Sequence, residues 1–399
     1  MKAGVGYSES PDSTTAGSQA ARAALAQAGL VHCDLVLLFS TARHDPQALR
    51  QAVASVVGPA ARIVGGWAVG AITNDCLGYA GDQVGLAAFD LGGVRCDVLA
   101  EGDLAEGEFP LGERLGRQLS DLGTTPTSPV LLLYDTVNRV HGRMRMIMAT
   151  PLLAGIEHSL GFLPDIAGAG LAGDMVGTPT HQWTGGGIAE RHALALLFPD
   201  AKVRMHSVIM HGCQPATGYY TVTRADAQTI LEIDGQPAVD FIGSILGPSV
   251  APEDYGFFVT LGVNKGYKWG DFDESAYVNR MCLKIDSKRR GLIMFEPDMV
   301  EGTQFQVMHR SVNLDYIAPR VESLFNALDG RRPVFALYIN CAGRAAGYAG
   351  IDEEDAAIVQ RAVGGRVPLL GLYTGVEIGS VLGRPRPLDW TGVFCLFSV

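Results

Sequence analysis

The chain has 399 residues, of which 47% are hydrophobic and 18% charged. This composition is typical of a well-buried globular protein, and the length favours two domains or one large composite. The net charge of −11 argues against a nucleic-acid or anionic-membrane partner, because such surfaces need clustered Lys and Arg. Two short basic runs, 139–145 and 287–290, are interpreted as a solvated helix start and a hairpin turn.

The seven cysteines are odd in number, scattered and never in C-x-x-C spacing, which argues against a disulfide framework or a zinc site. The nine histidines show no metal-ligand spacing either. We therefore expect no metal and no cofactor. The N-terminal residues lack the apolar core of a signal peptide, and no apolar run reaches the roughly 18 residues of a membrane span, so a cytoplasmic location is expected.

The first ninety residues predict the order strand, helix, strand, strand. Asp45 and Pro46 have the chemistry of an N-cap and of a first-turn proline. Gly29 and Gly58 follow two segments with helical spacing of Ala, Leu and Val. The expected elements are helices over 15–28 and 46–58 and strands over 34–40, 62–73 and 83–90.

This order returns twice along the chain. The second copy combines apolar strands with a long helical stretch that ends at Leu160, and the third contains a shorter helix. Such internal similarity outranks any single local motif. The elements expected are 128–136, the stretch to 160, 165–175 and 192–198 in the second copy, and 333–341, 352–363, 369–379 and 392–397 in the third.

A glycine-rich turn lies at the same place in each copy, reading GGWAVGAI, GAGLAGDM and GLYTGVEI, so that Gly65, Gly168 and Gly371 correspond. The second turn also has the G-x-G-x-x-G spacing of a dinucleotide loop. However, the residues after Gly173 cannot begin the helix that such a loop needs, so we reject nucleotide binding. A glycine is expected where the backbone bends or approaches a neighbouring strand closely.

The fold class predicted is α/β, with sheets built from repeated strand-helix-strand-strand units and helices covering their outer faces. Segments over nearly the whole chain resemble the FIST family, which pairs a FIST N with a FIST C domain. The predicted domains are therefore 1–200, similar to FIST N, and 201–399, similar to FIST C. The most specific segments are EIDGQPA (232–238) and CAGR (341–344), and the others are 34–40, 62–72, 83–90, 168–174, 222–243, 290–310 and 369–379.

The resemblance implies a bacterial sensory and signal-transduction module that binds small ligands, amino acids among them, without established catalysis. The chain also departs from the family. Gly66, Trp67 and Ala71 stand where the first turn of the family usually has Cys, Ser and Glu, and Gly375 and Val376 alter the last turn. The usual ligand of the family therefore cannot be assumed.

Arg344 follows the predicted strand 333–341, where a guanidinium can hold a ligand carboxylate through a bidentate pair. The structural alternative is an ion pair with an acid such as Glu377 or Asp174. Cys341 ends the same strand near this cation, a setting that lowers the pKa of a thiol. Its structural alternative is a buried, inert thiol.

Glu377 and Asp174 occupy one place in two copies of the turn, where a carboxylate either caps backbone N–H groups or binds a ligand ammonium. Tyr373 and Trp67 also correspond and either wall a pocket or pack in the core. The remaining binding candidates are Thr374, beside Tyr373, and Arg280, either a second anion contact or an exposed cation on the outer face of a strand.

Three functions are consistent with these residues. The first is a cytoplasmic protein that binds a small polar metabolite, with Arg344 on the anionic group and Asp174 or Glu377 on the donor groups, and signals through a partner protein. The second is an enzyme with Cys341 as nucleophile or Glu377 as base. The third is a protein-interaction scaffold.

Overall fold

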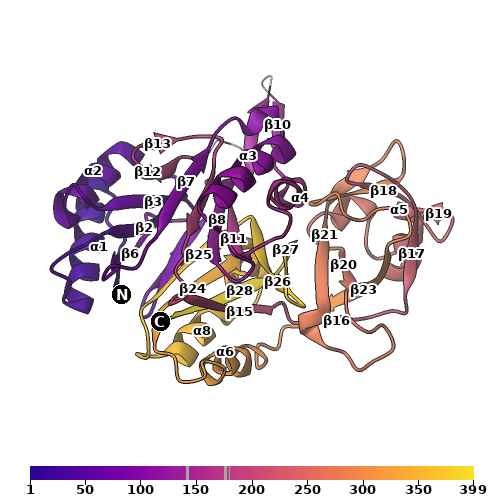
Figure 1. Cartoon of the computed structure of the whole chain (residues 1–399). Helices are drawn as coiled ribbons and strands as arrows, with labels where there is room; N and C mark the ends of the chain where they lie inside the picture. The colour runs from indigo at the N-terminus through magenta and orange to yellow at the C-terminus, as the bar shows by residue number, and fades with distance from the viewer. Residues whose placement is uncertain (141–142, 175–177, 179) are drawn as a thin grey trace.

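The computed structural model describes residues 1–140, 143–174, 178 and 180–399, and it contains three repeats and one inserted lobe (Figure 1). Each repeat contributes the centre of one six-stranded sheet, and the lobe has its own eight-stranded sheet. The α/β class is confirmed. The predicted boundary near residue 200 falls in the connection between the second and third repeats.

The elements follow one order in each repeat. The first repeat contains β1 (Lys2–Ser8), α1 (Ser13–Ala28), β2 (Leu35–Ser40), α2 (Pro46–Val57), β3 (Arg62–Trp67), β4 (Gly70–Thr73), β5 (Leu77–Tyr79) and β6 (Val84–Asp90). The second contains β7 (Asp97–Glu101), η1 (Leu104–Glu106), α3 (Glu108–Asp121), β8 (Pro129–Asp135), β9 (Val137–Val140), β10 (Arg143–Met146), α4 (Ala149–Leu160), β11 (Asp165–Leu171), β12 (Gln182–Gly185), β13 (Ile188–Ala189) and β14 (Ala193–Leu197).

The third repeat is split by the lobe, which enters after its first strand. The repeat contains β15 (Arg204–Met210), α6 (Ile317–Asn326), β24 (Pro333–Cys341), η4 (Ala342–Arg344), α7 (Ala346–Ala349), α8 (Asp355–Val363), β25 (Leu369–Thr374), β26 (Val376–Val381), β27 (Arg384–Leu388) and β28 (Gly392–Ser398). The lobe contains β16 (Cys213–Pro215), β17 (Tyr220–Asp226), β18 (Thr229–Ile233), β19 (Gln236–Pro237), α5 (Ala238–Leu246), η2 (Pro252–Tyr255), β20 (Thr260–Asn264), η3 (Glu274–Ala276), β21 (Tyr277–Asp286), β22 (Gly291–Met294) and β23 (Gln304–Arg310).

Local chemistry explains the ends of the first two helices. Asp45 accepts a hydrogen bond from the backbone N–H of Ala48 (2.6 Å), and Pro46 occupies the first turn of α2, as predicted. Gly29 ends α1 in the left-handed conformation. Among the described helices, none combines the length and apolar character needed to cross a bilayer.

The long helix expected before Leu160 is wrong in its first part. Residues 137–146 contribute the paired strands β9 and β10, and the helix begins only at Ala149. The alternating Arg and Met of 143–146 have the two-residue period of a strand, which explains the difference. The basic run 139–145 therefore belongs to this pair of strands, although 141–142 lie outside the described residues. The turn predicted over 287–290 is confirmed.

The three sheets exchange strands in a closed cycle. Each repeat contains one parallel pair of strands, namely β2 and β3, β8 and β11, or β24 and β25, and after this pair the chain bends into the neighbouring sheet. Thus β4 pairs with β25, β26 pairs with β11, and β12 pairs with β3. Each repeat consequently depends on a strand that belongs to another repeat.

Alternate residues of the central strands face two different cores. Leu37, Leu133 and Leu337 lie in one shared core between the sheets, whereas Leu38 and Leu132 pack under the helices of their own repeats. Burial on both faces explains why these strands are continuously apolar. Helices cover the outer faces, as predicted.

The corresponding glycines of the three repeats each lie against a carbonyl of the parallel neighbouring strand. A Cβ atom at Gly65, Gly168 or Gly371 would lie 1.9, 2.2 or 2.7 Å from the carbonyl oxygen of Leu38, Leu132 or Tyr338, respectively. No side chain can be accommodated at such distances without moving a strand. The predicted close approach of backbones therefore explains these glycines.

A buried carboxylate joins the lobe to the body. Glu296, in the lobe, accepts hydrogen bonds from the backbone N–H groups of Ala149 and Thr150 (both 2.9 Å) and so caps α4, whose own N-cap residue Met148 provides no side-chain bond. Complete burial raises the pKa of Glu296 to about 7, while the nearby Arg280 opposes the shift.

Gly65→Ala should destabilise the protein far more than Gly29→Ala. Gly65 has φ 143° and no room for a Cβ, whereas Gly29 has φ 58° and nothing within 4 Å. We expect a loss of about 1–2 kcal/mol at Gly29 from left-handed strain alone, and of more than about 4 kcal/mol at Gly65. Urea unfolding measures both variants, and equal losses would contradict the strand-contact explanation.

Glu296→Gln should reduce the dependence of stability on pH. Because the folded-state pKa is raised, the contribution of Glu296 is complete below its unfolded pKa and is lost as the pH rises through about 7. The free energy of unfolding should therefore fall between about pH 5 and about pH 8, with a share on the order of 3 kcal/mol from Glu296. Melting temperatures across this range test the variant. The exposed lobe residue Glu301 provides the control Glu301→Gln, and an equal pH slope in both variants would refute the assignment.

Candidate functional site

The bends of the three repeats meet and hydrogen-bond to one another. The backbone N–H of Val69 donates to the carbonyl of Tyr373 (3.0 Å), and the N–H of Gly375 donates to the carbonyl of Gly170 (3.0 Å). The hydroxyl of Thr374 also donates to the carbonyl of Gly170. Thr374 thus cross-links two bends in the interior.

A cavity of about 520 Å³ lies where the first and second bends meet, and we call it the bend cavity. Trp67 and Asp174 line it, so two of the residues predicted for binding share one space. The other lining residues are Thr41, Ala42, Arg43, Val69, Ala80, Gly81, Gly173, Thr178 and Tyr348.

Trp67 lines this cavity and carries a hydrogen-bond donor that has no partner among the described residues. Its side chain is only 7% exposed, and its Nε1 is buried without a partner among the described residues. The edge of the neighbouring His181 ring meets Trp67 at a centroid distance of 4.4 Å, which fixes the plane of the indole. A buried N–H without an acceptor is costly, so an acceptor from a ligand would be favoured here.

The bend cavity also contains charges of both signs. Arg43 is exposed in the turn after β2, and its guanidinium forms no ion pair with any residue that the structure describes. Asp174 accepts a hydrogen bond from the backbone N–H of Thr178 (3.3 Å). A cation and a carboxylate in one cavity can hold the two charged ends of a zwitterion.

Aromatic rings form a supported wall on the side of α7. Tyr348 lines the cavity, its ring lies 5.4 Å from that of Tyr79, and the ring of Tyr79 lies 5.2 Å from that of Tyr373. The hydroxyls of Tyr79 and Tyr373 both donate to Glu354 (2.6 and 3.2 Å). Tyr373 is fully buried, so it supports the wall from behind and does not line the cavity.

Cys341 and Glu377 lie together in the interior, away from the bend cavity. Burial raises the pKa of the Cys341 thiol, with a further contribution from Glu377, so the expected lowering of this pKa is wrong. Burial, followed by the charge of Asp389, also raises the pKa of Glu377 well above its usual range. Burial therefore favours the neutral form of both groups.

Asp174 and Glu377 do not occupy corresponding places, contrary to the alignment of the turns. Glu377 lies opposite Ala169 on β11, and the corresponding place opposite Gly66 on β3 holds Gln182. The second bend is longer than the other two, so Asp174 lies in its connection before β12. The sequence alone did not reveal this added length.

Arg344 is paired and lines a different, smaller cavity. It donates to Asp355 (2.9 Å), to the carbonyl of His211 (3.0 Å) and to the hydroxyl of Tyr316 (2.8 Å). Arg344 and Asp174 line different cavities. The structure therefore does not place them around one ligand, as the sequence had suggested.

Arg280 is fully buried and holds Asp298 through two hydrogen bonds of 2.5 and 2.6 Å. It also donates to the carbonyl of Pro387 (3.0 Å) and so ties the lobe to the third repeat. The alternative of an exposed cation is wrong.

The sequence did not predict Arg43 or Tyr348 as binding residues. Arg43 follows the buried strand β2, and ligand crevices commonly form where parallel strands end. The position of Arg43 could therefore have indicated a binding residue from the sequence. Tyr348 lies in a four-residue helix that no periodicity indicates.

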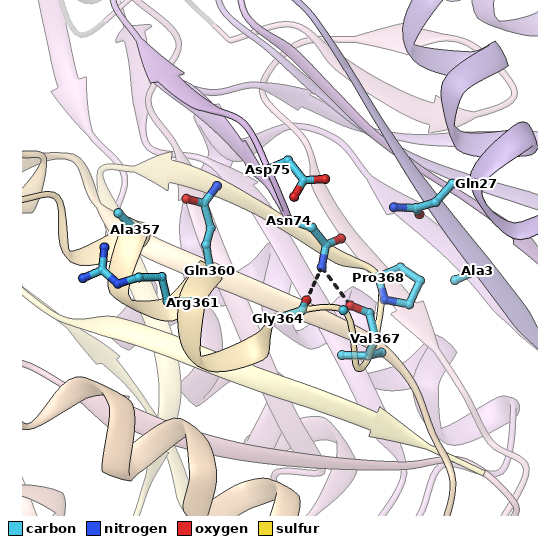
Figure 2. A pocket seen from close by; sticks show the side chains of 11 residues that line it. Ala3, Gln27, Asn74, Asp75, Ala357, Gln360, Arg361, Gly364, Val367 and Pro368 are labelled. Carbon is cyan, nitrogen blue, oxygen red and sulfur yellow. Dashed lines mark hydrogen bonds between the residues drawn. The ribbon is translucent and has the colours of Figure 1, made fainter.

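Another cavity, of about 630 Å³, lies between the β4–β5 hairpin and the end of α8 (Figure 2). Asn74 donates there to the carbonyls of Gly364 (3.1 Å) and Val367 (2.9 Å) and accepts from the N–H of Leu369 (2.9 Å). These bonds use Asn74 to close a loop, and none of the lining side chains holds a buried atom without a partner. No group of three His, Cys, Asp or Glu within the described ranges is placed to hold a metal ion.

Comparison with known proteins matches the chain to two domain models. The FIST N domain model matches residues 34–236, and the FIST C domain model matches residues 238–380. FIST domains are associated with sensing and signal transduction.

Mycobacterial proteins are among the relatives. Uncharacterized protein Rv0628c of Mycobacterium tuberculosis is 29% identical over 196 residues, which cover 48% of this chain and 50% of the relative. Uncharacterized protein Mb0898c of Mycobacterium bovis is 28% identical over 195 residues, with the same coverage. The match therefore spans about half the length of these relatives. Because the two domain models together cover most of its length, the chain belongs to the FIST family, with a FIST N domain followed by a FIST C domain.

Proposed function

We propose that the bend cavity binds a small zwitterion, such as a free amino acid, and that the protein acts as a sensor for it. The observation that carries this proposal is the indole N–H of Trp67, which is buried with no partner among the residues that the structure describes, on a residue whose cavity also holds Arg43 and Asp174. Arg43 and the indole would receive the carboxylate of the ligand, and Asp174 would receive its ammonium group.

The aromatic wall gives the ligand side chain a surface to pack against. Tyr348 is 52% exposed, and the rings of Tyr79 and Tyr373 behind it support its position. A side chain that packs on Tyr348 would bury apolar area on both partners. The ligand class favoured is therefore an amino acid with an apolar or aromatic side chain.

Sensing would proceed through a partner protein. Arg43 and Tyr348 are both exposed, and a ligand held between them would order both side chains. Such ordering changes a surface that a second protein can recognise.

Trp67→Phe should weaken amino-acid binding while leaving the fold intact, because it removes the N–H and keeps the ring. Loss of a hydrogen bond to a charged group costs about 1.5–3 kcal/mol, which corresponds to a dissociation constant at least tenfold higher. Arg43→Met should have a similar or larger effect. Isothermal titration calorimetry with a panel of the common amino acids measures these constants.

Trp269→Phe is the matched control, because Trp269 is 74% exposed and does not line the bend cavity. The Trp269→Phe variant should bind amino acids with the same affinity as the unmodified protein. Failure of every amino acid to bind, or an unchanged affinity in both Trp67→Phe and Arg43→Met, would refute the proposal. An empty panel together with one stoichiometric protein partner would favour a scaffold.

Cys341 should resist alkylation in the folded protein, which distinguishes binding from nucleophilic catalysis. Its thiol is 4% exposed and burial raises its pKa, whereas Cys76 is exposed. Treatment with iodoacetamide at neutral pH, followed by peptide mass mapping, should label Cys76 first and Cys341 only after unfolding. Selective labelling of Cys341 would support the enzyme alternative.

A further inference from the structure

We propose that a second cavity, between the lobe and the third repeat, binds a small monocarboxylate that carries an apolar tail. This cavity has a volume of about 230 Å³, and we call it the Arg310 cavity. None of the residues that line it lines the bend cavity. The residues that carry it are Arg310, Trp390, Phe258, Val312, Leu314 and Ile351.

Arg310 is held firmly in place but lacks a carboxylate partner. Its Nε and Nη2 donate to Thr260 Oγ1 (3.0 and 2.8 Å), and Nη2 also donates to the carbonyl of Phe257 (2.7 Å). Its guanidinium lies 3.7 Å from the ring centroid of Trp390. Within the described ranges its Nη1 has no hydrogen-bond partner, and no Asp or Glu forms an ion pair with it.

Arg366 provides a comparison for Arg310, because it stacks on an aromatic ring and also pairs with an acid. Its guanidinium lies 3.6 Å from the ring centroid of Phe325, and it pairs with Glu322 at 2.8 Å. Arg310 has the same stacking on an aromatic ring and lacks only the acid. A guanidinium placed in this way, with both N–H groups of Nη1 free of any described partner, favours a carboxylate in the plane of its fork.

The charges around the Arg310 cavity leave one positive charge uncompensated. Arg344 is paired with Asp355 at 2.8 Å, so these two lining residues neutralise each other. Burial, with a smaller contribution from Arg344, lowers the pKa of the Arg310 guanidinium, as expected for a desolvated cation without a counter-ion. The excess is opposite in sign to the net charge of −11 of the chain, so the local charge selects for an anion.

The walls of the cavity select for an apolar tail. Leu314, Ile351 and the ring of Trp390 line it, and Phe258 and Val312 are 54% and 77% exposed at its edge. Exposed apolar side chains around one cation provide a surface that an amphipathic acid would bury. The volume of about 230 Å³ limits the ligand to a small free acid.

Three probes separate charge from apolar contact: 3-phenylpropionate, the uncharged 3-phenylpropan-1-ol, and acetate, which lacks the tail. We expect 3-phenylpropionate to bind by calorimetry, with the alcohol and acetate each at least tenfold weaker. Arg310→Met should weaken binding of 3-phenylpropionate at least tenfold. Arg366→Met, the matched stacked arginine, should leave it unchanged.

Val312→Asp provides a second test that does not alter Arg310. Val312 is largely exposed, so the substitution should preserve the melting temperature, and the new carboxylate should occupy the free N–H groups and abolish binding. Absence of 3-phenylpropionate binding to the unmodified protein would overturn the proposal. So would equal affinity for the alcohol, or unchanged binding in Val312→Asp. Amino-acid binding in the bend cavity should be the same in all of these variants, so the two sites can fail separately.

Discussion

The exchange of strands among the three repeats is the constraint on which the rest of the structure depends. Each bend carries its chain into the neighbouring sheet, and this path requires backbones in direct contact at Gly65, Gly168 and Gly371. Strands of neighbouring repeats therefore hold each bend in place. Trp67 and Val69 of the bend cavity thus lie on backbone that is held by neighbouring strands, which favours preorganisation of this part of the site.

Two buried charged side chains join the lobe to the repeats. Arg280 and Glu296, both fully buried, join the lobe to backbone groups of the second and third repeats. Arg280 satisfies a carbonyl, whereas Glu296 satisfies the free N–H groups at the start of a helix. Because Arg280 is used in this interface, it is unavailable to a ligand, although the sequence indicated it as a possible anion contact.

The two cavities are proposed to bind different ligands, and residues of one short helix line both. Tyr348 of α7 lines the bend cavity, and Ala349 of the same helix lines the Arg310 cavity. Trp67 stands where FIST proteins usually have a small polar residue in the first turn. This replacement adds an indole N–H and an aromatic face to the bend cavity, so the departure from the family pattern coincides with the residue that carries the proposed function.

The sequence by itself determined the repeated order of helices and strands outside residues 137–146, the helix caps at Asp45 and Gly29 and the correspondence of the three glycines, because each depends on local periodicity or on backbone sterics. Only the tertiary structure decided which strands exchange, that Gln182 and not Asp174 corresponds to Glu377, and that Arg344 is paired with Asp355. The partner of a charged side chain, and the cavity that it faces, depend on residues distant in sequence. Contacts of this range leave no period or spacing in the chain from which they could be predicted.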